Sequence, residues 1–130
     1  MSSVLVVGAT GYFGSRLVRE LLAETPATIV AAARDRARLE RWCGELPKGR
    51  VVARQLDLSD EVSIADALRE VRVAVLAAGP FQGLPRTLAR LCCERGIAYV
   101  DLSDDRAYTA EVNRMAQTLG ARAPVCSGWS

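Results

Sequence analysis

The sequence predicts an α/β fold, a doubly wound parallel sheet of six strands in the order 3-2-1-4-5-6. Three glycines, Gly8, Gly11 and Gly14, follow the apolar run 4–7 and precede a segment with helical periodicity. Along the rest of the chain, short apolar runs alternate with amphipathic segments. Because crossovers between parallel strands are right-handed, this alternation predicts a sheet with helices on both faces.

The six predicted strands are short apolar runs, at 3–7, 28–33, 51–56, 73–78, 97–101 and 123–126. The run 73–78 is apolar throughout, which is typical of a parallel strand covered on both faces. Pro124 restricts the last run to an edge strand or to a strand start.

The five predicted helices lie at 11–24, after Asp35, after Asp60, at 82–95 and at 105–119. Asp35 and Asp60 are suitable N-caps, and Gly44, Gly96 and Gly120 are suitable helix ends. The buried positions expected on the later helices are Leu39, Trp42, Ile64, Ala65, Leu68, Leu84, Leu88, Leu91, Cys92, Tyr108, Val112, Met115 and Leu119.

The composition limits the classes of function that fit this chain. The chain has 130 residues, 50% of them hydrophobic, which fits one domain with a core of its own. A formal net charge of +2 does not favour nucleic acid as a partner, and no apolar run is long enough to span a membrane. Histidine is absent, which removes the commonest general base and metal ligand.

The cysteines show no spacing typical of a metal site. Cys92 and Cys93 are adjacent, and Cys43 and Cys126 stand alone. We therefore expect no bound metal and reduced, mostly buried thiols in a cytoplasmic protein. Cys126 is conceivable as a nucleophile, but no neighbour in the sequence would deprotonate it, so we expect a buried structural cysteine there.

The glycine spacing fits the pyrophosphate of a dinucleotide. Gly8 allows a sharp turn after the strand, Gly11 lets the main chain approach the phosphates, and Gly14 lets the helix pack closely. The free N–H groups of the first helical turn attract an anion. The remaining candidate cofactor-binding residues of this loop are Thr10, Tyr12 and Phe13.

Arg34 points to NADP as the cofactor. A site selective for NAD places a carboxylate about twenty residues past the glycine loop, where it binds the ribose hydroxyls. Arg34 occupies that region here, and a guanidinium there would bind a 2′-phosphate, with Arg36 and Arg38 adding positive charge. Asp35 is the alternative: shifted by one residue it would bind the ribose and make NAD possible, although it is also a good helix cap.

Two further loops are expected at the carboxyl edge of the sheet. Asp57 is placed to accept a hydrogen bond from the adenine amino group with Leu58 packing on the ring, or to cap the next helix. The residues after run 73–78 would pass close to the nicotinamide ribose, with Phe81 either flanking the cofactor or anchoring the core. The candidates in that loop are Ala78, Gly79, Pro80 and Phe81.

No catalytic group can be named. In short-chain dehydrogenases a catalytic tyrosine is followed four residues later by lysine, but Tyr12, Tyr99 and Tyr108 are followed by Arg16, Ser103 and Val112. The catalytic residues therefore stay unknown, and we expect no turnover from this chain alone.

Three segments together resemble the NADP-binding (Rossmann) domain of saccharopine dehydrogenase-like proteins. They are 4–14 with the glycines, 78–83 with its Gly-Pro-Phe, and 96–105 with its Tyr-Val-Asp-Leu. The resemblance covers nearly the whole chain. It implies an oxidoreductase that uses NADP(H) and acts on an imine, an amino acid or a related small molecule.

The resemblance also implies a second domain beyond residue 130, which supplies much of the substrate site and often a homodimer contact. Two alternatives stay open. One is a non-catalytic dinucleotide sensor similar to the NmrA-type regulators, which share the glycine loop and lack the Tyr/Lys pair. The other is the cofactor domain of a semialdehyde or acyl-phosphate reductase, which would need a histidine beyond residue 130.

Overall fold

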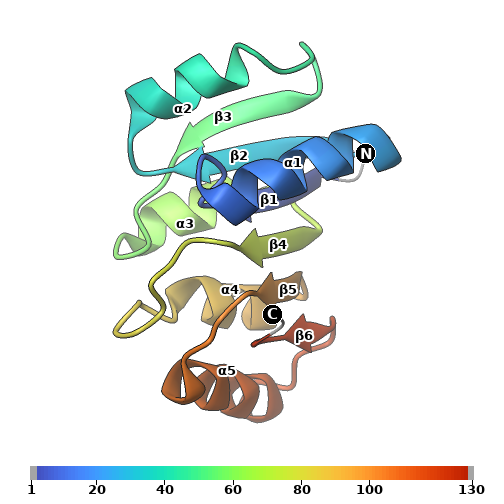
Figure 1. The fold of residues 1–130 in the computed structure, drawn as a ribbon. Helices are drawn as coiled ribbons and strands as arrows, with labels where there is room; N and C mark the ends of the chain where they lie inside the picture. The colour runs from blue at the N-terminus through green and yellow to red at the C-terminus, as the bar shows by residue number, and fades with distance from the viewer. Residues whose placement is uncertain (1–2, 129–130) are drawn as a thin grey trace.

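A computed structural model of the chain describes residues 3–128. Within them, strands and helices alternate along the chain, and the strands form one parallel sheet (Figure 1). The strands are β1 (Ser3–Val7), β2 (Thr28–Ala33), β3 (Val51–Gln55), β4 (Val73–Leu76), β5 (Ala98–Asp101) and β6 (Val125–Cys126). The helices are α1 (Tyr12–Glu24), α2 (Arg36–Cys43), α3 (Glu61–Ala67), α4 (Thr87–Arg95) and α5 (Arg106–Thr118).

The strand order is β3-β2-β1-β4-β5-β6, and all the pairings are parallel. This confirms the predicted fold and order. Because β1 pairs with β2 on one side and β4 on the other, the chain changes direction across the sheet at β1. In such sheets ligands bind at the carboxyl ends of the strands beside that switch point.

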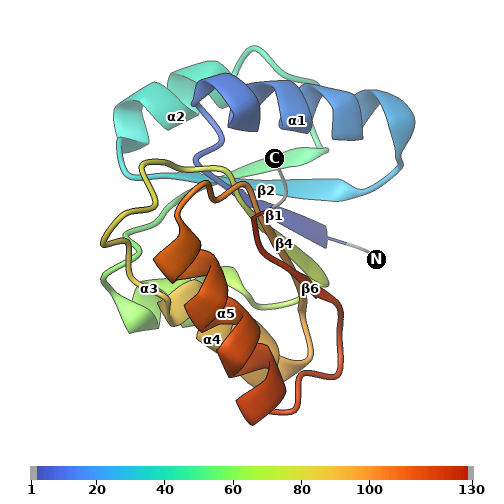
Figure 2. The same cartoon turned by 60° about the horizontal axis from the view of Figure 1, so that its bottom comes forward.

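The sheet separates two hydrophobic cores. Helices α1 and α2 cover one face, while α3, α4 and α5 cover the other (Figure 2). Side chains on β1 alternate accordingly: Val6 joins the core under α1 and α2, whereas Leu5 and Val7 join the opposite core. Both faces of the central strand β4 are covered by helices, which explains why it contains no polar residue.

Three helices begin at an aspartate that caps them. Asp35, Asp60 and Asp105 accept hydrogen bonds from main-chain N–H groups in the first turns of α2, α3 and α5. The predicted caps at Asp35 and Asp60 are therefore confirmed. Helix α4 ends at Gly96, as predicted, with this glycine in the left-handed conformation (φ 70°).

The predicted start of α4 at residue 82 is wrong, because the helix begins at Thr87. Gly83 has φ 72°, which no right-handed helix accommodates. Pro85 also disfavours a helical conformation for Leu84. Leu84 instead closes a turn by donating its N–H to the Phe81 carbonyl (3.0 Å), so residues 77–86 are free to form a loop at the edge of the sheet.

Two expectations about burial are also wrong. Leu119 is 40% exposed, because α5 ends at Thr118 and Leu119 is its C-cap. Cys126 is exposed on the short edge strand β6, whereas Cys92 and Cys93 are buried as predicted. No disulfide links the four cysteines, all of which lie within residues 3–128.

Candidate functional site

The glycine loop after β1 packs against two neighbouring segments. Gly8 has φ 83°, and its N–H donates to the Ala32 carbonyl of β2 (2.9 Å). A Cβ on Gly8 would lie 2.7 Å from the main-chain nitrogen of Ala78, and a Cβ on Gly14 would lie 2.0 Å from the Gly8 carbonyl oxygen. The loop therefore has no space for side chains at these two positions. It also brings the segments after β1 and β4 into contact.

Helix α1 presents unpaired N–H groups at this loop. Its N-cap is Gly11, which offers no side-chain acceptor, and its first turn contains no acidic residue. Within residues 3–128, the main-chain N–H groups of Tyr12, Phe13 and Gly14 have no hydrogen-bond acceptor. Together with the helix dipole, three such donors form a binding site for an anion.

The face above these donors is open. A Cβ on Gly11 would meet only the Gly8 carbonyl oxygen, at 3.3 Å, among its non-neighbouring atoms. The adjacent side chains of Tyr12 and Phe13 are 69% and 63% exposed, and their rings pack edge to face with centroids 5.1 Å apart. Arg16 donates to the Tyr12 hydroxyl (2.7 Å) and lies over its ring. The open face and the free donors fit the pyrophosphate of a dinucleotide.

Arg34 and Asp35 lie directly after β2, at the same edge of the sheet. The Arg34 side chain is exposed and makes no hydrogen bond or ion pair with residues 3–128, while its carbonyl accepts from Gln55 Nε2 (3.0 Å). Asp35 Oδ1 accepts from the Arg38 N–H (3.1 Å) as the cap of α2. Arg38 Nη2 reaches the Thr10 carbonyl oxygen (3.4 Å) and so connects α2 to the glycine loop.

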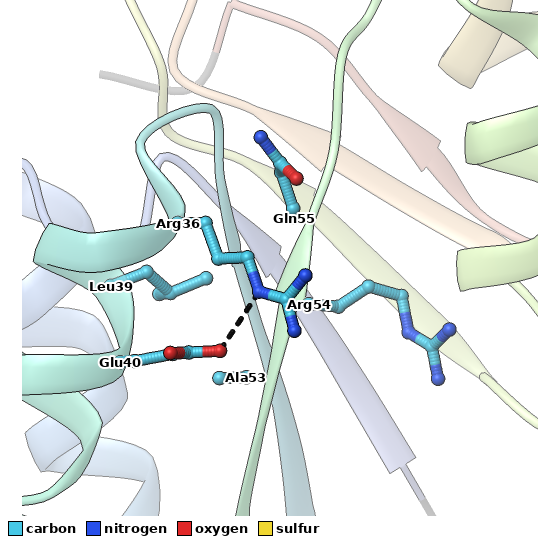
Figure 3. Close-up of a pocket in the computed structure, with 6 residues that line it drawn as sticks. All are labelled: Arg36, Leu39, Glu40, Ala53, Arg54 and Gln55. Atoms are coloured by element: carbon cyan, nitrogen blue, oxygen red, sulfur yellow. Dashed lines mark hydrogen bonds and ion pairs between the residues drawn. The ribbon is translucent and has the colours of Figure 1, made fainter.

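Arg36 does not join this group. Its Nε lies 2.9 Å from Glu40 Oε1, and the pair lies beside β3 in a pocket lined by Arg36, Leu39, Glu40, Ala53, Arg54 and Gln55 (Figure 3). The Arg54 side chain extends away from α2 and pairs with Asp66 of α3 (3.0 Å). Of the two additional arginines considered from the sequence, Arg38 therefore contacts the glycine loop, whereas Arg36 is paired with a carboxylate.

Of the aspartates in the loop after β3, Asp60 and not Asp57 caps α3. Asp60 caps α3, accepting from the N–H groups of Val62 (3.1 Å) and Ser63 (3.3 Å). Asp57 Oδ1 accepts from the hydroxyl (2.6 Å) and the N–H (2.9 Å) of Ser59. These bonds, and to a smaller extent the charge of Arg34, lower the pKa of the exposed Asp57 carboxyl. Leu58 packs into the core.

A cavity of about 570 Å³ opens at the carboxyl ends of β4 and β5. Its lining is mostly apolar and comes from α1 and from the segments after β4 and β5: Phe13, Ala77, Gly79, Pro80, Phe81, Leu102 and Asp104. Phe81 lines the cavity and also anchors the core, since it is 5% exposed and packs edge-on to Tyr108 of α5. Both roles considered for Phe81 are therefore compatible with its position.

Sequence reasoning did not identify Leu102 and Asp104 as site residues. They follow β5, and the same rule that selected the residues after β1, β2, β3 and β4 applies to them. The signal was available, because the segment 96–105 stood out in the sequence.

A buried polar cluster lies at the end of β5, directly before the cavity residues Leu102 and Asp104 in the sequence. Asp101, which is fully buried at the end of β5, accepts from the Tyr99 hydroxyl (2.7 Å) and the Ser103 N–H (3.0 Å). It also accepts from the Ser127 hydroxyl (2.8 Å) and the Gly128 N–H (2.9 Å), which fixes the segment after β6. The donors come from β5, from the segment after it and from the segment after β6, so the Asp101 carboxylate ties these three segments together.

The tyrosines of this cluster stay protonated. The hydroxyls of Tyr99 and Tyr108 lie 3.0 Å apart, and Tyr99 donates to Asp101. Burial raises the pKa of Tyr108 to about 12, and burial together with the charge of Asp101 raises that of Tyr99 further. Neither hydroxyl therefore supplies a tyrosinate base near neutral pH.

No set of three or more His, Cys, Asp and Glu side chains within residues 3–128 is placed to hold a metal ion. In the same range, no helix combines the length and the apolar character that crossing a membrane requires.

Comparison with known proteins agrees with this geometry. The family model of the saccharopine dehydrogenase NADP-binding domain matches residues 4–124. No curated protein sequence matches.

Several solved structures share the fold. The chain superposes on the triphenylmethane reductase of Citrobacter sp. with a TM-score of 0.75 and 19% identity, covering 96% of this chain and 47% of that one. It superposes on the NADPH-dependent quinone oxidoreductase QOR2 of Escherichia coli, complexed with NADPH, with a TM-score of 0.70 and 24% identity, covering 90% and 45%. The chain thus spans about half the length of these proteins.

The family match covers nearly all of the chain and confirms the resemblance drawn from the three sequence segments. It also agrees with the parallel sheet, the glycine loop and the unpaired donors of α1. The chain belongs to the saccharopine dehydrogenase NADP-binding domain family, and NADP is its cofactor.

Proposed function

We propose that this chain is the NADP(H)-binding part of an oxidoreductase that transfers hydride to or from an imine, an amino acid or a related small molecule. The observation that carries the proposal is the N-terminus of α1, where three unpaired N–H groups face an open surface beside Gly11. NADP fits there because its pyrophosphate supplies the acceptors that these donors lack.

The two halves of the cofactor on either side of the pyrophosphate then extend to different parts of the site. From the pyrophosphate, the adenosine half extends towards Arg34 and Asp57, and the nicotinamide half extends towards the apolar cavity that includes Phe13 and Phe81. When bound, the cofactor supplies the hydride. Phe13, Pro80 and Phe81 shield its ring from water, and Arg34 holds the phosphate at the other end.

Arg34 is the residue proposed to select NADP over NAD. Its guanidinium is exposed and has no partner within residues 3–128, so no ion pair has to break when a phosphate binds. The competing carboxylate of Asp35 is engaged with the N–H of Arg38 as a helix cap, which draws it away from the ribose.

Arg34→Ala is expected to remove most of the preference for NADP. A charge-assisted hydrogen bond contributes about 1.5–3 kcal/mol, so the wild-type chain should bind NADP roughly tenfold to a hundredfold more tightly than NAD. Isothermal titration of both cofactors, at low and at high salt, measures this ratio, and salt should reduce it.

The matched control is Arg41→Ala, which removes the same charge from the last turn of α2. It should leave the ratio unchanged. Equal binding of NAD and NADP to the wild type, or an equal loss of both in Arg34→Ala, would contradict the assignment of Arg34.

The chain alone is expected to bind cofactor without turnover. It contains no histidine, and among residues 3–128 Asp104 is the one ionisable group that lines the cavity. We propose that a further domain beyond residue 130 supplies the missing groups and any homodimer contact. NADPH oxidation measured with candidate imines should show no rate above the protein-free control, and a reproducible rate that depends on the protein would contradict this.

The absence of histidine, with Asp104 as the one ionisable residue at the cavity among residues 3–128, also favours a second candidate function, a non-catalytic sensor of NADP. In the complete gene product, a long continuation after residue 130 would favour the oxidoreductase. For either function we propose a cytoplasmic location, which is supported by four free cysteines and no disulfide among them.

A further inference from the structure

Among the described residues 3–128, one carboxylate lines an otherwise uncharged cavity. Of the seven lining residues, Asp104 alone is charged, and the others are Phe13, Ala77, Gly79, Pro80, Phe81 and Leu102. Within residues 3–128 the Asp104 side chain is exposed and has no hydrogen-bond donor and no cation as a partner. By contrast, the adjacent Asp105 is occupied as the N-cap of α5, where it accepts from Tyr108 N–H (2.8 Å).

Two arginines beside the walls of the cavity are engaged elsewhere. Arg86, which lies over the Tyr108 ring behind Phe81, has its Nε 3.0 Å from Glu111 Oε2. Arg16 donates to Tyr12, next to Phe13. Neither guanidinium pairs with Asp104, and Arg106, which shares a neighbouring hollow with Asp104, is not part of this cavity's lining. Within residues 3–128 no ion pair neutralises Asp104, so the lining carries one negative charge beside an apolar surface.

We propose that Asp104 makes this cavity select a planar ring that carries a positive charge, namely the oxidised nicotinamide of NADP⁺ over the uncharged ring of NADPH. The inference rests on the proposed function, because it takes the cavity as the place of the nicotinamide. Phe13 supports that placement, since it belongs both to the first turn of α1 and to the lining.

The physical basis is the difference between the two rings. The oxidised ring carries one positive charge and the reduced ring carries none, while their size and apolar surface are nearly the same. A carboxylate at the rim therefore stabilises one oxidation state by Coulomb attraction and leaves the other unaffected. Apolar walls strengthen the effect by excluding water from one side of the pair.

The test is the ratio of the dissociation constants of NADPH and NADP⁺, measured by isothermal titration of the 130-residue chain. In Asp104→Asn this ratio should fall about twofold to fivefold relative to wild type, the range of a partly exposed charge pair. Asp104→Glu keeps the charge and should keep most of the ratio. Raising the salt concentration should shrink the difference between wild type and Asp104→Asn.

Glu24→Gln is the matched control, because it removes an exposed carboxylate from the last residue of α1, at the opposite end of that helix from Phe13. It should leave the ratio unchanged. A ratio that is the same in Asp104→Asn and wild type would overturn the role of Asp104 while leaving the proposed function intact. Failure of the wild-type chain to bind either form would instead count against the proposed function.

Discussion

Gly8→Ala is expected to lower the free energy of unfolding by roughly 2–5 kcal/mol. Gly8 has φ 83°, and a left-handed conformation costs a residue with a side chain about 1–2 kcal/mol. The new methyl group would also lie 2.7 Å from the nitrogen and 2.8 Å from the Cα of Ala78. Both are main-chain atoms of the segment that follows β4, so the backbone must move to relieve the overlap, at a cost of about 1–3 kcal/mol.

Urea unfolding monitored by circular dichroism measures this loss. Gly11→Ala is the matched control, because Gly11 has φ −76° and a Cβ there meets only the Gly8 carbonyl oxygen at 3.3 Å. It should cost clearly less stability than Gly8→Ala and weaken NADP binding, since the methyl group occupies the face proposed for the pyrophosphate. Similar stabilities for Gly8→Ala and wild type would mean that the contact between the loops after β1 and β4 is not rigid.

Asp101→Ala is the second large effect that we expect. The substitution removes the acceptor from the N–H groups of Ser103 and Gly128 and from the hydroxyls of Tyr99 and Ser127. Tyr99 and Ser103 are buried, and each buried donor left without an acceptor costs about 1–3 kcal/mol. The loss should therefore reach several times the cost of a single hydrogen bond, and the segment 127–128 should detach from β5.

Two measurements separate these effects. Urea unfolding gives the overall loss, and hydrogen exchange at Gly128 reports the local detachment. Ser127→Ala removes one donor and keeps the carboxylate, so it should cost only about 0.5–1.5 kcal/mol. If Asp101→Ala and Ser127→Ala destabilise the chain equally, the carboxylate is not the centre of the cluster.

Much of the fold followed from the sequence because its determinants are local. The periodicity of apolar residues located all six strands, and Asp35 and Asp60 marked helix starts where they were expected. The strand order required only right-handed crossovers in addition. The start of α4 was wrong because the leucine pattern that includes Leu84 outweighed Gly83 and Pro85, which end helical geometry at that point.

The site was accessible to sequence reasoning only in part. The glycine loop and Arg34 have fixed separations along the chain, so a motif predicts them. The cavity at Phe13 and Asp104, and the cluster at Asp101, depend on contacts between segments far apart in the sequence. Asp105 caps α5, whereas the adjacent Asp104 faces the cavity. Packing decides between these two roles, and the periodicity of the sequence does not predict them.

The missing cap of α1 also has a consequence for the lifetime of the protein. Three helices are capped by their own aspartates, whereas the first turn of α1 has no side-chain cap, and we propose that the cofactor completes it. A ligand that binds only the native state opposes unfolding by mass action, by about 2.7 kcal/mol at one hundred times its dissociation constant. Resistance to proteolysis should therefore follow the supply of NADP, so that the abundance of the protein becomes coupled to the dinucleotide pool.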